Sequence, residues 1–282
     1  MKANLEIDVK CFNLKYTLEC GQCFRWKSVN ENTYIGVIQD RVIKIRQDGD
    51  KVYIWSSLQK NLKQVVYEYF DFNTNYEEVE CEISKIDKNI EQSLNYSSGI
   101  HILNQPLFET IISYIISANN NIKRISKSVD DISKMFGKKV EFEGKDYYLF
   151  PTLEELSKAT MDDLLGCGTG FRARYILKDV LELMDNKSVL DNLKKMETEE
   201  AREILSKMMG IGPKVADCIL LFSLKKSEVF PVDVWVKRIM EKLYFKENTS
   251  LRVISKYAND SFGKYAGIVQ QHLFHNVREG NI

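Results

Sequence analysis

The sequence predicts an α+β protein in which a small N-terminal antiparallel sheet precedes a mostly helical, two-lobed body with a helix-hairpin-helix motif. Three observations predict this class. Short β-branched and aromatic runs, separated by turn-forming residues, fill the first 56 residues. Helical periodicity takes over at about residue 59. Finally, Gly210 and Gly212 lie between two helical segments and indicate a tight hairpin.

The expected sheet lies in the first 56 residues, where short gaps between the runs favour an antiparallel meander. The predicted strands cover residues 23–26, 34–38, 42–45 and 52–55, with turns at 30–32, 39–40 and 48–50. We expect a sheet domain with flanking helices at 1–95 and a helical body at 96–282. The helix-hairpin-helix motif is placed at about 203–224 within that body.

The helix predicted to open at Pro106 shows the pattern expected of the helical body. Its apolar residues fall on one stripe, so most of the helix should be buried. It should end at residues 119–121, three asparagines that have poor helix propensity and tolerate left-handed backbone. Every proline lies where a helix could begin or just before such a point. The four are Pro106, Pro151, Pro213 and Pro231.

Charge and hydropathy narrow the possible partners and location. The 40 basic and 40 acidic residues cancel, so total charge alone does not suggest a nucleic-acid partner. The distribution is uneven, because residues 68–94 carry eight acidic side chains against two lysines and residues 207–246 carry eight basic against four acidic. Such a chain can present one cationic face. No apolar run approaches the roughly 18 residues of a membrane span, and no secretion signal begins the chain. We expect an intracellular protein (cytoplasm or nucleoid, if bacterial) with no membrane partner.

The six cysteines show no disulfide framework, and reduced thiols are expected inside cells. Cys20 and Cys23 form a C-x-x-C pair that could suggest zinc or redox chemistry. A zinc site requires about four ligands at suitable spacing. His272 and His275, which could supply two more, lie far from Cys20 and Cys23 in sequence. No βαβ pattern surrounds the pair, which disfavours a thioredoxin-like site. We expect no metal and no cofactor.

The segment 205–218 carries the densest chemical signal. The exposed amides of a hairpin at Gly210 and Gly212, followed by a helix that starts at Pro213, could bind one phosphate. Lys214 falls in the first turn of that helix, where the dipole and any burial disfavour the charged amine and should lower its pKa. A neutral amine is a competent nucleophile that could attack a sugar carbon and then hold the product as a Schiff base.

Asp233 follows Pro231 and is predicted to be the N-cap of the next helix. A carboxylate there could stabilise an oxocarbenium-like sugar, orient Lys214 or move protons. The simpler interpretation stays open at this point. In that interpretation, Asp233 only caps a helix and Lys214 only meets a phosphate.

The segment 210–218 and the Pro-Val-Asp that ends at Asp233 resemble the helix-hairpin-helix/Gly-Pro-Asp superfamily of DNA glycosylases. Within it, the chain is similar to the 8-oxoguanine DNA glycosylases. Further blocks match in order at 21–26, 119–124, 168–175 and 265–270, together with Phe274. The resemblance covers nearly the whole chain.

The resemblance implies specific roles in recognising the damaged base. Lys214 would be the nucleophile and Asp233 the catalytic carboxylate. The Gly21 carbonyl would accept the N7 hydrogen that 8-oxoguanine carries and guanine lacks. Gln270 and Phe274 are one helical turn apart, and they would bond the Watson–Crick edge of the flipped base and stack on it. The remaining base-binding positions are Cys218, under the other face, and Phe222; a turn role for Gly21 and core packing for Phe274 and Cys218 stay open.

A second group would manage the duplex after the base has left the stack. Asn119 resembles the residue that fills the gap, and Phe171 stands where many relatives have a tyrosine wedge. Arg124 and Arg172 resemble the pair that holds the orphaned cytosine; their other interpretation is solvated surface charge. Departures from the family pattern are Trp235, where a histidine is frequent, and Phe222, where a methionine is frequent.

The function implied is a bifunctional DNA glycosylase and AP lyase that flips out and excises 8-oxoguanine in base excision repair, preferably opposite cytosine. The expected partner is double-stranded DNA containing oxidised guanine, and a monomer is expected. The Cys-rich tail that binds an iron–sulfur cluster in other branches is missing, so no cluster is expected. Two alternatives stay open, namely a glycosylase for another lesion such as an alkylated purine, and a non-catalytic helix-hairpin-helix module that binds duplex DNA.

Overall fold

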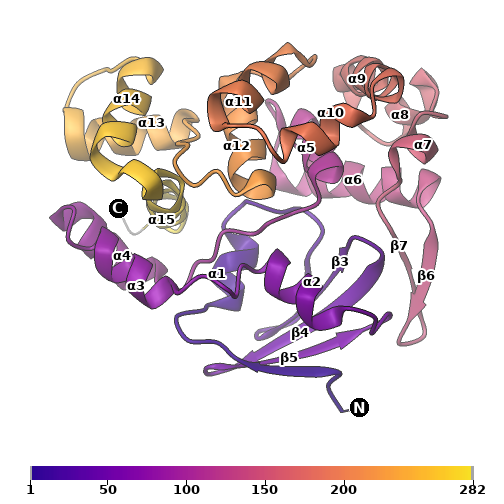
Figure 1. Cartoon of the computed structure of the whole chain (residues 1–282), viewed down its shortest axis with the longest axis horizontal. Helices are drawn as coiled ribbons and strands as arrows, with labels where there is room; N and C mark the ends of the chain where they lie inside the picture. The colour runs from indigo at the N-terminus through magenta and orange to yellow at the C-terminus, as the bar shows by residue number, and fades with distance from the viewer. Residues whose placement is uncertain (1, 281–282) are drawn as a thin grey trace.

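The computed structural model describes residues 2–280 and confirms the predicted α+β class (Figure 1). A five-stranded antiparallel sheet lies below a largely helical body. Residues Ile43, Ile45 and Ile54 point from the sheet into its core and are completely buried, as strand alternation requires. The strands are β1 (Leu5–Asp8), β2 (Lys27–Asn30), β3 (Thr33–Ile38), β4 (Arg41–Asp48) and β5 (Lys51–Ser56), in the order β1-β5-β4-β3-β2.

The turns predicted inside the sheet are present. Gln39 and Gly49 both adopt positive φ, as tight connections between antiparallel strands require. The predicted strand at 23–26 is wrong, because β2 begins only at Lys27. The side chains of Cys23 and Phe24 are both buried, but in different cores: Cys23 in that of the sheet and Phe24 in that of the helical body. These neighbours are therefore interior residues of a loop between two cores.

Four further elements were not predicted. β1 and the short helix α1 (Leu14–Glu19) lie in the region read as a simple meander. A hairpin of β6 (Lys139–Phe142) and β7 (Lys145–Tyr148) interrupts the helical region, turning at a Glu143–Gly144 pair with positive φ at both residues. The hairpin descends beside the sheet in Figure 1, and Phe142 packs on the sheet's other face. Lys44 of β4 binds Glu143 at 2.6 Å, so the helical body is anchored to the sheet.

The helical body is built around α5, which is buried on nearly all sides as predicted, with Pro106 at its N-cap. Its end follows the prediction too, because Asn119 adopts a left-handed φ of +53°. The helices that follow α1 and precede α12 are α2 (Leu62–Tyr69), α3 (Tyr76–Ile83), α4 (Lys88–Ser97), α5 (Leu107–Ser117), α6 (Ile122–Phe136), α7 (Leu153–Leu156), α8 (Met161–Gly166), η1 (Gly170–Arg172), α9 (Ala173–Asp185), α10 (Ser188–Leu193) and α11 (Thr198–Lys207). The others are α12 (Pro213–Leu224), α13 (Val234–Met240), the π-helical η2 (Glu241–Phe245), α14 (Leu251–Phe262), η3 (Gly263–Tyr265) and α15 (Ala266–Arg278).

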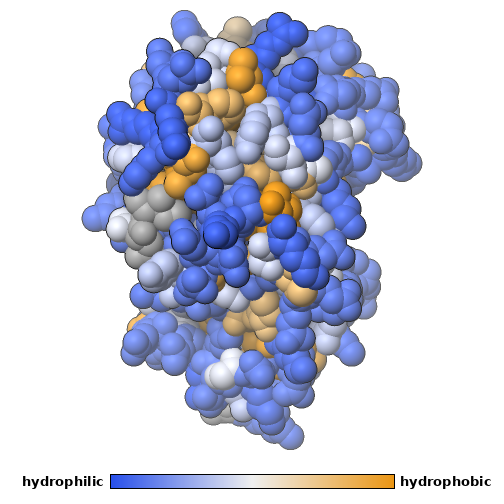
Figure 2. All heavy atoms as spheres, turned by 90° about the vertical axis from the view of Figure 1, so that its left-hand side faces the viewer, coloured by the Kyte–Doolittle hydropathy of each residue, from blue (hydrophilic) through white to orange (hydrophobic). Residues whose placement is uncertain are grey.

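Two groups of helices face each other across the body. Helices α13 to α15 lie on the left of Figure 1, whereas α5 and α12 lie at its centre. On the face that Figure 2 shows, hydrophilic side chains predominate and apolar ones occur in small groups. Between residues 2 and 280 no helix is both long and apolar enough to cross a membrane.

Candidate active site

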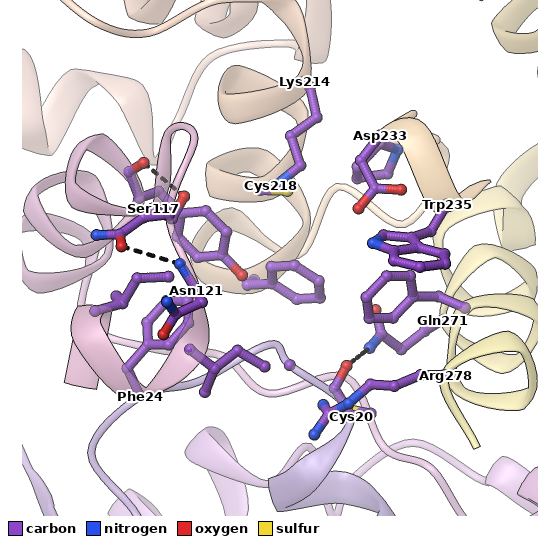
Figure 3. Close-up of a pocket in the computed structure, with 18 of the residues that line it drawn as sticks. Cys20, Phe24, Ser117, Asn121, Lys214, Cys218, Asp233, Trp235, Gln271 and Arg278 are labelled. Carbon is purple, nitrogen blue, oxygen red and sulfur yellow. Dashed lines mark hydrogen bonds between the residues drawn. The ribbon is translucent and has the colours of Figure 1, made fainter. Parts of the chain in front are cut away.

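A cavity of about 920 Å³ lies between the two groups of helices, above the loop that follows α1. All the residues predicted to act on the base or the sugar line it, although they come from four separate segments of the chain. Figure 3 shows Lys214 and Asp233 facing the same space from different helices. The seven are Gly21, Lys214, Cys218, Phe222, Asp233, Gln270 and Phe274.

Lys214 is the second residue of α12, directly after Pro213 at its first position. Its side chain runs down the helix toward Cys218 (Figure 3) and is partly exposed. The amine lies 5.6 Å from the centre of the Tyr114 ring, within cation–π range. Burial raises the pKa of the Cys218 thiol to about 11, an effect that nearby Lys214 opposes. Cys218 is therefore a neutral thiol in the wall of the cavity near pH 7.

Asp233 is the N-cap of α13, as predicted: its Oδ1 accepts a hydrogen bond from the Val236 amide at 2.8 Å. One carboxylate oxygen thus has a structural role, and the other is left for the cavity. Within residues 2–280 no ion pair joins Asp233 to Lys214. A substrate sugar could therefore enter between the amine and the carboxylate.

Gly21 has a φ of +90°, so the turn interpretation is correct and a side chain would be strained there. A Cβ at this position would also lie 3.3 Å from Cε1 of Phe274. The carbonyl of Gly21 has no hydrogen-bond donor among the described residues. A turn role and an open acceptor in the cavity are thus compatible.

The remaining base-binding candidates form a mostly apolar wall with one polar group. Cys218 and Phe222 are 4% exposed, and Phe222 stacks on Tyr114 with ring centres 5.8 Å apart. Gln270 is 5% exposed, and its Oε1 is buried without a partner in the described part of the chain. Leaving a buried amide oxygen unpaired is unfavourable, so this group is suited to a polar ligand.

The residues predicted to hold the duplex do not line the cavity but lie together beside it. Arg172 donates to the carbonyls of Ala118, Asn119 and Thr169, which uses four of its five N–H groups. It is 5% exposed, so the interpretation as solvated surface charge is wrong for Arg172. Its guanidinium also covers Phe171, with 4.4 Å from Cζ to the ring centre.

Asn119, Arg124 and Phe171 are the exposed members of this group. Phe171 leaves 53% of its surface exposed, which is unusual for so large an apolar side chain. Burial, together with the neighbouring Arg124 guanidinium, lowers the pKa of Arg172. Two cations held side by side favour an electron-rich partner between or above them.

The helix-hairpin-helix motif forms as predicted from α11, the hairpin and α12. Gly210 has a φ of +85°, and a Cβ there would lie 2.7 Å from Cδ2 of Tyr175, so both backbone and space require glycine. Gly212 has ordinary extended backbone with open space around it, so only a close ligand would require glycine there. Arg202 binds Asp217 at 2.8 Å and ties the two helices together.

Sequence patterns missed a buried carboxylate that supports the hairpin. Asp179 of α9 is completely buried and accepts a hydrogen bond from the Met209 amide at 2.8 Å, while its Oδ2 has no partner in the described part of the chain. Burial raises the pKa of the Asp179 carboxyl to about 6. Because α9 begins next to Arg172, this contact joins the hairpin to the group beside the cavity.

We expect Asp179→Asn to remove a pH dependence of stability. Asp179 titrates at about 6 when folded and at about 3.9 when unfolded, so the folded state loses stability as pH rises through this interval. The loss amounts to at most about 3 kcal/mol. Asparagine keeps an acceptor for Met209 but does not titrate. Denaturant unfolding of both proteins should show that the free energy of unfolding of the variant rises relative to that of the wild type between pH 4 and 7.5. A difference in this free energy that stays constant with pH would contradict this role.

Sequence reasoning also missed two further cavity residues, Tyr114 and Gln271. Tyr114 interrupts the aliphatic stripe of α5, and Gln271 adjoins Gln270; no motif marked either. Trp235, noted as a departure from the family pattern, lines the cavity with 54% of its surface exposed. Cys20 and Cys23 are buried free cysteines that form no disulfide. Residues 2–280 hold no group of three or more potential metal ligands.

The chain matches two protein-family models. One, described as the N-terminal domain of 8-oxoguanine DNA glycosylase, matches residues 4–111. The other, described as HhH-GPD superfamily base excision DNA repair protein, matches residues 112–261. A probable N-glycosylase/DNA lyase of Methanothermobacter thermautotrophicus is 30% identical, over 99% of this chain and 97% of that protein. The N-glycosylase/DNA lyase OGG1 of Arabidopsis thaliana is 30% identical over 93% of this chain and 76% of its own length.

Solved structures give the same picture. The 8-oxoguanine glycosylase/lyase of Clostridium acetobutylicum, bound to double-stranded DNA with cytosine opposite 8-oxoguanine, superposes with a TM-score of 0.93. It is 39% identical and covers all of both chains. A 3-methyladenine DNA glycosylase of Archaeoglobus fulgidus has a TM-score of 0.82 at 24% identity over 99% of both chains, a likeness of fold alone.

Proposed function

The chain belongs to the HhH-GPD superfamily of base excision DNA repair proteins and, within it, to the 8-oxoguanine DNA glycosylase/lyase family; from this premise we propose that it excises 8-oxoguanine from duplex DNA with Lys214 as nucleophile. The single observation that carries the proposal is the convergence of seven candidate residues on one cavity. A module that only bound DNA would have no need of a cavity lined by an amine, a carboxylate and an unpaired amide.

In the proposed reaction, the amine of Lys214, once it has lost its proton, attacks C1′ of the flipped nucleoside. The bond from C1′ to N9 breaks, and the base leaves with the electron pair and takes up a proton. The nitrogen gives up a proton, and the C1′–O4′ bond then breaks with its electron pair on O4′, which takes up a proton. A Schiff base between C1′ and Lys214 is left. Removal of a C2′ proton then expels the 3′ phosphate. Water finally hydrolyses the imine and regenerates the amine.

Asp233 is proposed to stabilise positive charge on the sugar as the base departs. Its cap bond to Val236 fixes the carboxylate before the substrate arrives, so little reorganisation is needed in the transition state. Asp233 could also accept the proton that the nitrogen gives up and pass it to O4′ as the ring opens.

Recognition of the base is proposed to depend on Gly21 and Gln270. The Gly21 carbonyl would accept the N7 hydrogen of 8-oxoguanine, whereas guanine presents a lone pair and is repelled. The unpaired amide of Gln270 would bond the Watson–Crick edge. The Phe274 ring and Cys218 would contact the two faces of the base.

Competition kinetics test this proposal against its nearest rival. Duplexes containing 8-oxoguanine, alkyladenine or thymine glycol would be mixed, and release of each base followed under single turnover. We expect 8-oxoguanine to be released fastest by a wide margin. Faster release of alkyladenine would show instead that the protein is a glycosylase for alkylated purines. Salt-dependent binding without release of any base would favour the non-catalytic module.

Preference for cytosine opposite the lesion is part of the proposal and rests on Arg124. Arg124→Ala should slow excision opposite cytosine by about tenfold and leave the rates opposite the other three bases nearly unchanged, because only the contact to cytosine is lost. Arg174→Ala is the matched control, an exposed arginine two residues beyond Arg172. Loss of a phosphate contact there would lower all four rates alike. Equal wild-type rates opposite all four bases would refute the preference alone.

A further inference from the structure

The loop around Gly21 is held by side chains from distant parts of the chain. On its N-terminal side, the Glu19 carbonyl accepts from Arg278, and the Cys20 carbonyl accepts from Nε2 of Gln271 at 2.9 Å. Both donors come from α15, the helix that carries Gln270. The peptide that precedes Gly21 is therefore fixed to the same helix that reads the base.

On the C-terminal side, the Gln22 carbonyl accepts two hydrogen bonds. One comes from Nε2 of Gln105 at 2.7 Å and the other from the Tyr114 hydroxyl at 3.2 Å. The backbone amide of Gln105 in turn donates to the Phe222 carbonyl of α12. This side of the loop is thus fixed to the helix that carries Lys214.

The side chain of Gln22 also holds the loop around Gly21 in place. It is completely buried, and its Nε2 donates to the carbonyls of Thr17 and His101 at 2.9 and 2.8 Å. Its Oε1 accepts from the Leu103 amide at 2.9 Å. Every carbonyl from Glu19 to Gln22 except that of Gly21 therefore has a donor from another side chain.

We propose that Gln271 and Tyr114 are positioning residues that determine specificity by making the Gly21 carbonyl rigid. This inference rests on the proposed function. A carbonyl distinguishes an N7 hydrogen from an N7 lone pair only if it cannot turn away, because a small rotation of the peptide would relieve the repulsion from guanine. Glycine alone would permit such a rotation, since its backbone has few steric limits. The flanking hydrogen bonds remove that freedom.

The test compares single-turnover excision of 8-oxoguanine and of guanine, each opposite cytosine, by Gln271→Met and Tyr114→Phe. Methionine nearly fills the volume of glutamine without a donor, and phenylalanine keeps the ring below Lys214. In each variant we expect the ratio of the two rates to fall about tenfold, the effect of one buried hydrogen bond. The guanine rate should rise while the 8-oxoguanine rate falls.

Ser133→Ala is the control, because it removes a buried hydroxyl that donates to the Val129 carbonyl at 2.8 Å away from the cavity lining. It should keep the wild-type ratio. A purely structural role would lower both rates in parallel, so an unchanged ratio in both variants overturns the inference. If Gln271→Met does not fold, the ratio in Tyr114→Phe decides. Wild-type protein that does not prefer 8-oxoguanine would instead refute the proposed function.

Discussion

Lys214→Gln is expected to slow release of 8-oxoguanine at least about 1,000-fold and to abolish strand cleavage by β-elimination. Glutamine is one atom shorter than lysine and favours a helix, and Lys214 is partly exposed, so folding should be unaffected. Only the nucleophile is lost. The measurement is single-turnover release of the base with enzyme in excess, with strand cleavage followed on the same samples.

The cavity offers a matched control for this substitution. Lys123 also lines it but is exposed at the start of α6. Lys123→Gln removes the same charge from the same cavity, and we expect base release to change less than about tenfold through weaker attraction of DNA. Release by Lys214→Gln within tenfold of wild type, or an equal loss in the two variants, would contradict a nucleophilic role for Lys214.

Asp233→Asn is expected to reduce turnover by about 100- to 10,000-fold while DNA binding is retained. Asparagine caps helices about as well as aspartate, so the bond to the Val236 amide should survive and stability should change by less than about 0.5 kcal/mol. What disappears is the negative charge beside the sugar. Equilibrium binding and single-turnover kinetics measured on the same duplex separate these effects.

Asp87 provides the corresponding control, because it is an aspartate N-cap on α4 and does not line the cavity. Asp87→Asn should leave turnover unchanged. If Asp233→Asn turns over at a near-normal rate, Asp233 is only a cap. If its loss of rate is matched by a loss of DNA binding, the carboxylate acts before the chemical step and the proposed electrostatic role is wrong.

The sequence predicts much of this cavity because local chemistry determines how its parts lie. Pro213 starts a helix, so Lys214 must fall in the first turn, and Asp233 is positioned by its own cap bond. The residue type of Gly210 is enough to indicate its backbone conformation, because a positive φ is common only for glycine. These features depend on neighbours within a few residues, which patterns in a sequence report well.

Contacts between distant segments could not be predicted in the same way. Arg172 looks like an exposed arginine in sequence, but the end of α5 supplies carbonyls that bury it. Gln271 is one of two adjacent glutamines, and only the folded chain brings it to Cys20, 251 positions earlier. The residues 23–26 resemble a strand by composition, yet two cores compete for their side chains. Tertiary packing therefore overrides local propensity at these places.

The most direct test of the central claim is borohydride trapping on a duplex that contains 8-oxoguanine, followed by proteolysis and mass spectrometry of the adduct. Reduction converts a Schiff base into a stable bond between protein and sugar, so the modified peptide identifies the attacking amine. We predict a single adduct at Lys214. An adduct at Lys123 or at the α-amino group, or base release with no adduct formed, would contradict the account.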